Sequence, residues 1–235
     1  MNQAERTLKI LLEPMLREHG FKPLSSHLGF KRRTEFGFHY LSMPSFAWRK
    51  GGPYVVDVGL GVRHNRVDEV VNRLGHIWGK ANQKNTTTVY RGLKFFPFDA
   101  PRDGEKVITL DKMDQDARSV ASDISTMLLA DGFEFFRLYS NVYECAVGLN
   151  APIESRTHPL HNSFTLRAYY GVVAAALAQP ERVESLVQSY IDSARQEGVA
   201  ESILFDVGKE FSGIDAFASR LKFVADAALA SAFES

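Results

Sequence analysis

Cysteine is scarce in this sequence: Cys145 is the single cysteine among 235 residues. One cysteine excludes an internal disulfide and any zinc site built from several thiolates. Scarcity of cysteine is also typical of proteins from a reducing compartment. The remaining composition, with 45% hydrophobic and 24% charged residues, is ordinary for a soluble globular chain that is long enough to bury a sizeable core.

An excess of charge of one sign is also lacking. The chain has 28 Lys and Arg residues against 28 Asp and Glu residues, so its formal net charge is zero. Proteins that bind nucleic acid usually carry a basic excess, and such a role here would require a local patch. Nucleic acid is therefore a partner that the net charge does not favour.

Long hydrophobic runs are missing. The most apolar stretch, Tyr169 to Ala178, is too short to cross a bilayer. Near the N-terminus, Glu5, Arg6 and Lys9 interrupt the apolar residues, so this region does not form the apolar block of a signal peptide. We expect a cytoplasmic protein without a membrane partner.

Complete nucleotide-binding motifs are absent too. Gly59 and Gly61 lie between a predicted strand and a predicted helix, but His64 occupies the position where a dinucleotide fingerprint has its third glycine. No acidic residue occurs within 70–94 to bind a ribose. The stretch 75–80 is one residue short of a phosphate-binding loop. We predict that the chain uses no cofactor.

Two histidines, His158 and His161, lie in the stretch 150–162, which breaks the periodicity of its flanks. Two imidazoles could face a metal, but metal sites need three or four ligands and Glu154 is the one acidic residue nearby. The alternative is that both rings form hydrogen bonds within the loop. We predict no metal site and keep both histidines as candidate binding residues.

Periodicity predicts mixed secondary structure in the first part of the chain. Apolar residues at helical spacing from Leu8 to Leu16 predict a helix, with Gly20 as its C-terminal stop. Alternating aromatics at 36–40 predict a strand, and 86–93 and 106–110 are further strand candidates. The alternation across 54–62 predicts one half-buried strand of an antiparallel sheet, followed by a helix that Asn65 caps.

The second part of the chain is predicted to be helical. Apolar spacing indicates a helix at 112–130 that Gly132 ends, another through 135–146, an αα-hairpin after residue 162 and a terminal helix from Ile214. We therefore predict an α+β fold, with an antiparallel sheet flanked by helices in 1–150 and a C-terminal helical segment in 151–235. The two parts could pack as one unit.

Cations border the aromatic strands. Arg32 and Arg33 lie beside the first strands, whose aromatic residues include Trp48. Arg63, His64 and Arg66 follow the strand at 54–62. If the strands pair as a hairpin, these side chains gather at one end of the sheet and suit a phosphate group or an acidic protein. The alternative is that the aromatics form the core and the cations solvate the edges of the sheet.

Several short motifs resemble a bacterial family catalogued as domain of unknown function 4304. The motifs are Leu-x-x-x-Gly-Phe-Lys at 16–22, a second Gly-Phe-Lys at 29–31, the strand at 55–62, Phe-Phe at 135–136 and Tyr-Ser at 139–140. The repeated Gly-Phe-Lys departs from the family pattern. The resemblance covers roughly residues 8 to 150 and implies a compact α+β domain without assigned catalytic residues. It also implies a role as an antitoxin-like immunity partner or accessory factor.

The sequence thus favours a non-catalytic protein-binding module, of the immunity or antitoxin-like type or an accessory protein. Its contact surfaces would be the cations at the end of the sheet and the loop from Pro152 to His161. The alternative is an enzyme, or a protein that binds a phospholigand or nucleic acid, and that uses Arg63, His64 and Arg66 at the end of a strand. Oligomeric state and the identity of the partner stay open.

Overall fold

A computed structural model describes residues 2–25, 27–47, 54–75, 83–93, 107–108, 113–155, 158–161, 163–197 and 213–233. The fold is α+β, with an antiparallel sheet and helices in the C-terminal part, which confirms the predicted class. The chain forms two compact units. Unit 1 comprises Met1–Val62 and Arg91–Arg137, and unit 2 comprises Arg63–Tyr90 and Leu138–Ser235. The sequence suggested one boundary near residue 150, whereas here the segment 63–90 groups with the C-terminal helices.

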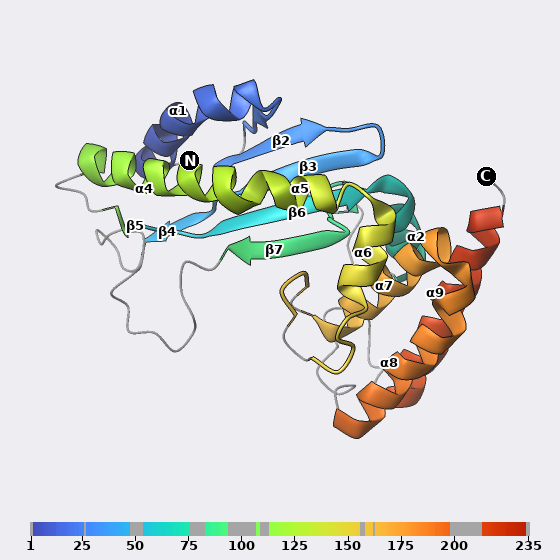
Figure 1. Ribbon diagram of the computed structural model, residues 1–235. Helices are drawn as coiled ribbons and strands as arrows, with labels where there is room; N and C mark the ends of the chain where they lie inside the picture. Colours follow the sequence, from blue (N-terminus) through green and yellow to red (C-terminus); the bar gives the residue numbers. More distant parts are fainter. Residues whose placement is uncertain are drawn as a thin grey trace. The chain divides into compact units, whose positions relative to one another are not determined.

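The main sheet has five strands in the order β1-β2-β3-β6-β7 (Figure 1). These strands are Lys22–Pro23, Gly29–Arg33, Gly37–Ser42, Val58–His64 and Val89–Leu93. A second sheet has three strands in the order β4-β5-β8, at Ser45–Ala47, Tyr54–Val56 and Val107–Ile108. β4 and β5 pair antiparallel, as expected for a hairpin, while the predicted turn at 51–53 lies outside the described residues.

Three helices of unit 1 lie along one face of the main sheet (Figure 1). They are α1 (Gln3–Glu18), α4 (Met113–Met127) and α5 (Phe133–Leu138). Asn2 caps α1, since its side chain accepts a hydrogen bond from the Glu5 amide and Glu5 reciprocates. The predicted apolar stripe of α1 is buried, and Gly20 follows the helix with φ of 78°. On this face Arg32 donates to the carbonyl of His19 after α1, and His39 stacks on Phe136 of α5. Phe30 and Leu41, which lie opposite each other on β2 and β3, share the face by strand alternation and have no exposed surface.

The predicted strand at 54–62 is wrong in two respects. It is two strands in two different sheets, because β5 ends at Val56 and β6 begins at Val58. The expected open face is not open, since every residue of β6 is buried. The alternation misleads because two of its polar-face positions are glycines without a side chain, and a third, Arg63, is bound inside unit 2 by Asp68.

The prediction that Gly132 ends a helix is wrong. A π-helical turn at Leu128–Gly132 joins α4 to α5 instead. A Cβ added at Gly132 would lie 2.7 Å from Cδ2 of Leu128, so a larger residue here would displace the buried Leu128 side chain. The widened turn is the reason that the chain continues as a helix past the glycine.

The α-helices described in unit 2 are α2 (Asn65–Gly75), α6 (Val142–Leu149), α7 (Phe164–Ala178), α8 (Val183–Glu197) and α9 (Ile214–Phe233). α7 is buried along most of its length and packs against the other four. The predicted hairpin and the terminal helix are confirmed. The single helix predicted across 135–146 is wrong: α5 ends at Leu138, and Asn141 caps α6 by accepting a hydrogen bond from the Tyr143 amide.

Candidate functional site

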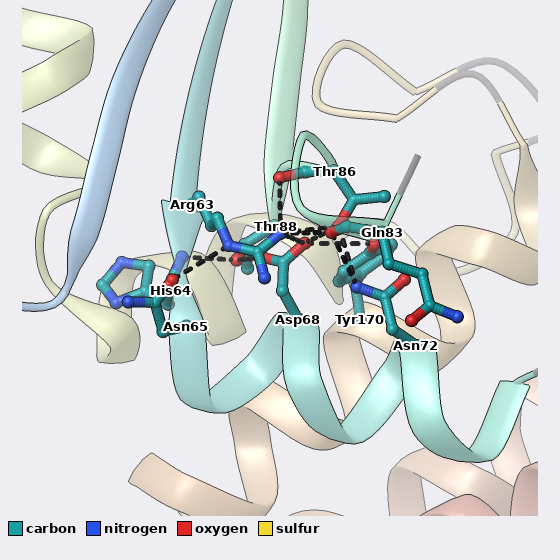
Figure 2. A network of polar contacts seen from close by, with 9 residues as sticks. All are labelled: Arg63, His64, Asn65, Asp68, Asn72, Gln83, Thr86, Thr88 and Tyr170. Atoms are coloured by element: carbon teal, nitrogen blue, oxygen red, sulfur yellow. Dashed lines mark hydrogen bonds and ion pairs between the residues drawn. The ribbon is translucent and has the colours of Figure 1, made fainter. Parts of the chain in front are cut away.

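A buried carboxylate, Asp68, is the centre of a polar network in unit 2 (Figure 2). The residue lies in the first turn of α2, directly after β6, and its side chain has no exposed surface. Its Oδ1 accepts hydrogen bonds at 2.6 Å from Thr86 Oγ1 and at 3.3 Å from Arg63 Nη1 and the Tyr170 hydroxyl. Its Oδ2 accepts one at 2.6 Å from Thr88 Oγ1. Four donors from β6, α7 and the segment before β7 therefore converge on one carboxylate.

Arg63 neutralises this carboxylate and is itself fully engaged (Figure 2). Its side chain is 8% exposed, and its Nη1 also reaches the carbonyls of Gln83 at 2.8 Å and Thr86 at 3.1 Å. Its Nε donates to Oδ1 of Asn65 at 2.9 Å, so the residue that was expected to cap α2 instead holds the guanidinium. Arg63 thus ties the end of β6 to α2 and to the segment 83–88.

Burial raises the pKa of Asp68 to about 6, and the Arg63 charge and the hydroxyls of Thr86, Thr88 and Tyr170 oppose this shift. Burial also raises the pKa of the Tyr170 hydroxyl well above its usual range. A carboxylate with no exposed surface does not meet a ligand in this conformation. The network therefore acts on the fold of unit 2, where it joins three segments that are distant in sequence.

His64, the next candidate, is also directed inward. Its ring Nε2 lies 2.9 Å from the carbonyl of Tyr139, and its backbone amide donates to Thr88 Oγ1 at 2.8 Å. Burial lowers the pKa of His64, with the Tyr139 hydrogen bond opposing the shift. Arg66 lies on the exposed side of α2. The structure therefore splits the predicted cluster, with Arg63 and His64 buried and Arg66 at the surface.

His158 and His161 hold the loop that contains them. Nδ1 of His158 accepts from the Leu160 amide at 3.2 Å, and Nδ1 of His161 accepts from the Ser163 amide at 3.4 Å. The ring of His161 stacks on Tyr170, with centroids 5.5 Å apart. Burial, together with the charges of nearby Arg167 and His158, lowers the pKa of His161 to about 4. Burial also lowers the pKa of His158. Within the described part of the chain, no group of three or more His, Cys, Asp or Glu residues is placed to hold a metal.

A buried arginine on α7, Arg167, supports the same loop and was not anticipated from the sequence. Its guanidinium donates to the carbonyls of Pro152 at 3.1 Å and Ile153 at 2.5 Å. Of the carboxylates that the structure describes, none forms an ion pair with it, and its buried Nε has no partner. The predicted contact loop is therefore held from inside by Arg167 and by its own histidines.

The candidates on unit 1 separate according to strand alternation. Arg32 faces the helices, where its Nη1 donates to the carbonyl of His19 at 3.0 Å and its Nε donates to Nδ1 of His39 at 3.1 Å. Its guanidinium also lies 5.0 Å from the ring centre of Phe21. Arg33, one position further, is exposed on the opposite face of β2. Trp48 lies outside the described residues.

The strand register gathers further cations beside Arg33. Lys22 on β1 lies directly opposite Lys31 on β2, and Lys31 in turn lies opposite Tyr40 on β3. Arg33 lies opposite Phe38 in the same way. Because residues paired across strands share a face, these five side chains occupy the face opposite the one along which α1, α4 and α5 lie. We call Lys22, Lys31, Arg33, Phe38 and Tyr40 the basic sheet face.

Comparisons of the chain with protein-family models, with curated proteins and with solved structures found no match. The resemblance to domain of unknown function 4304 therefore stays a prediction. Among the described residues, no helix has the length and apolarity needed to cross a membrane.

Proposed function

We propose that this chain is a non-catalytic protein-binding module. The observation that carries the proposal is the use of its reactive side chains: Arg63, His64, His158 and His161 are each tied into internal contacts of unit 2. Side chains that a catalytic site would present to a substrate here stabilise the fold. The exposed cations of unit 1 stay available for recognition.

The finer proposal is an immunity or antitoxin-like role, or that of an accessory protein, in a bacterial cell. Such proteins act by covering a partner, which requires a stable surface and no chemistry of their own. The buried polar network of unit 2 suits this role, because it contributes to the stability of the fold that presents the surface. The alternative enzyme or phospholigand site at the end of β6 would need residues other than Arg63 and His64, because both are buried.

Affinity purification of the full chain from its source cells, followed by native mass spectrometry, tests the proposal. We expect a complex with one protein partner in stoichiometric amount. A chain that instead retains a small molecule or a metal, without a protein partner, would overturn the proposal. The variant Arg118→Glu serves as a control for charge reversal. Arg118 is exposed on α4, away from the proposed contact surfaces, so this variant should retain the partner.

A further inference from the structure

The basic sheet face places two like charges directly opposite each other. Lys22 and Lys31 are register partners on antiparallel strands, so their Cβ atoms are only about 5 Å apart. Arg33 lies two residues along β2 on the same side. Like charges in this arrangement destabilise a sheet, and a bound anionic group would relieve the repulsion.

The described part of unit 1 supplies no such group to the two exposed cations of the basic sheet face. Lys22 and Arg33 are both exposed, and neither forms an ion pair with a described carboxylate. Lys31 is held in place, because its Nζ lies 3.9 Å from the centre of the Phe38 ring. The three cations therefore form a positive patch on the face of the main sheet opposite α1, α4 and α5, and the Lys31 side chain in it is held against Phe38.

We infer that the basic sheet face binds an acidic segment of a partner protein. This inference rests on the protein-binding function proposed above and names the chemistry of the partner. Carboxylates match the patch, since Lys22 and Lys31 offer point charges and Arg33 offers a fork of donors.

The same patch is poorly suited to single-stranded nucleic acid, whose bases stack on open aromatic rings. Phe38 is only 8% exposed and lies beneath the Lys31 ammonium group. Tyr40 is half-buried, and its hydroxyl is held 2.8 Å from the His27 ring. A protein of zero net charge also lacks the long-range field that draws a polyanion to a nucleic-acid-binding protein.

Fluorescence anisotropy with a labelled decaglutamate peptide tests the inference on the full chain. The wild-type chain should bind the peptide, and the affinity should fall as salt is raised. The double variant Lys22→Glu/Arg33→Glu should weaken binding about tenfold or more, because two attractions become two repulsions. The double variant Arg6→Glu/Arg118→Glu makes the same change in net charge at exposed positions of α1 and α4, and should bind like wild type.

Three results would overturn the inference: no binding of decaglutamate to the wild-type chain, equal loss in both double variants, or tighter binding of a ten-nucleotide oligothymidylate that the Lys22/Arg33 variant abolishes. Thermal unfolding of each variant confirms that it is folded. Failure here is distinguishable from failure of the proposed function. A protein partner that co-purifies equally with wild type and with the Lys22/Arg33 variant would support protein binding through another surface.

Discussion

One cluster of cations in each unit shows a clear contrast in the partners that its side chains meet. In unit 2 the guanidinium of Arg63 is buried and meets Asp68, two backbone carbonyls and Asn65. In unit 1 Lys22 and Lys31 lie opposite each other on adjacent strands, with Arg33 beside them at the surface. A charge that is neutralised internally contributes to folding, whereas a charge left against a like charge is more useful for recognition. On the function proposed above, the buried network stabilises unit 2, and the basic sheet face of unit 1 is the surface that recognises the partner.

The largest effect is expected for Arg63→Ala. The variant leaves the Asp68 carboxylate buried without its counter-ion, and breaking a buried pair in this way costs about 3–5 kcal/mol of unfolding free energy. Urea denaturation measures the loss. Arg66→Ala, three residues further along the chain and exposed, should change the stability by less than about 0.5 kcal/mol. Similar losses in both variants would contradict the structural role of the network.

The next effect concerns pH. Burial raises the pKa of Asp68 from 3.8 to about 6, so between these values the folded chain binds a proton that the unfolded chain has released. The contribution of Asp68 to stability is therefore complete below pH 3.8 and is lost as the pH rises through about 6. A shift of this size corresponds to roughly 3 kcal/mol.

Unfolding free energies of wild type and Asp68→Asn, compared from pH 4 to pH 7, isolate this contribution. The stability of the wild type relative to the variant should fall with rising pH and become level above about pH 6. A difference that stays constant across this range would show that Asp68 titrates normally.

Thr88→Val should have an intermediate effect. The hydroxyl of Thr88 donates to Asp68 and accepts from the His64 amide, so its removal takes one hydrogen bond from each of these buried groups. The expected loss is about 1–3 kcal/mol. Thr87→Val, at the neighbouring half-buried position, should cost less in the same denaturation experiment. Equal costs would indicate that the loss reflects strand packing and not the network.

The smallest expected change in stability is that of a charge reversal in unit 1. Lys22→Glu converts a repulsive cross-strand pair with Lys31 into an attractive one, and should raise the unfolding free energy by about 0.5 kcal/mol. The same reversal at Arg118 on α4 has no cross-strand partner and should give no such gain. A loss of stability in Lys22→Glu would show that the lysine already serves the fold.

The sequence predicted the fold class and most of the helices because their signals are local. Apolar spacing in α1 and the twin patterns of α7 and α8 depend on neighbours within one or two turns. The errors arose where a tertiary contact overrides the local signal. Gly132 packs closely against Leu128 inside a continuous helical segment, and the break at Asp57 divides one apparent strand between two sheets.

The basic sheet face was predicted in part, since Arg33 was identified as a candidate binding residue while Lys22 was missed. The role of Lys22 depends on its register with Lys31, nine residues away, which no local pattern reveals. Arg63 and His64 looked like a surface cluster because their partners are remote. Thr86 and Thr88 lie 18 and 20 residues from Asp68, and Tyr170 lies 102 residues away. The available signal was Asp68 itself, an acidic residue beside the apolar stripe of α2 that begins at Val67.

Hydrogen exchange of the full chain with and without decaglutamate shows which surface binds the acidic peptide. We expect the peptide to increase the protection of backbone amides in the segment 22–42 and to leave the segments 63–75 and 158–161 unchanged. Protection that appears around Arg63, His64 or the His158–His161 loop, with none at Lys22, Lys31 and Arg33, would contradict this expectation.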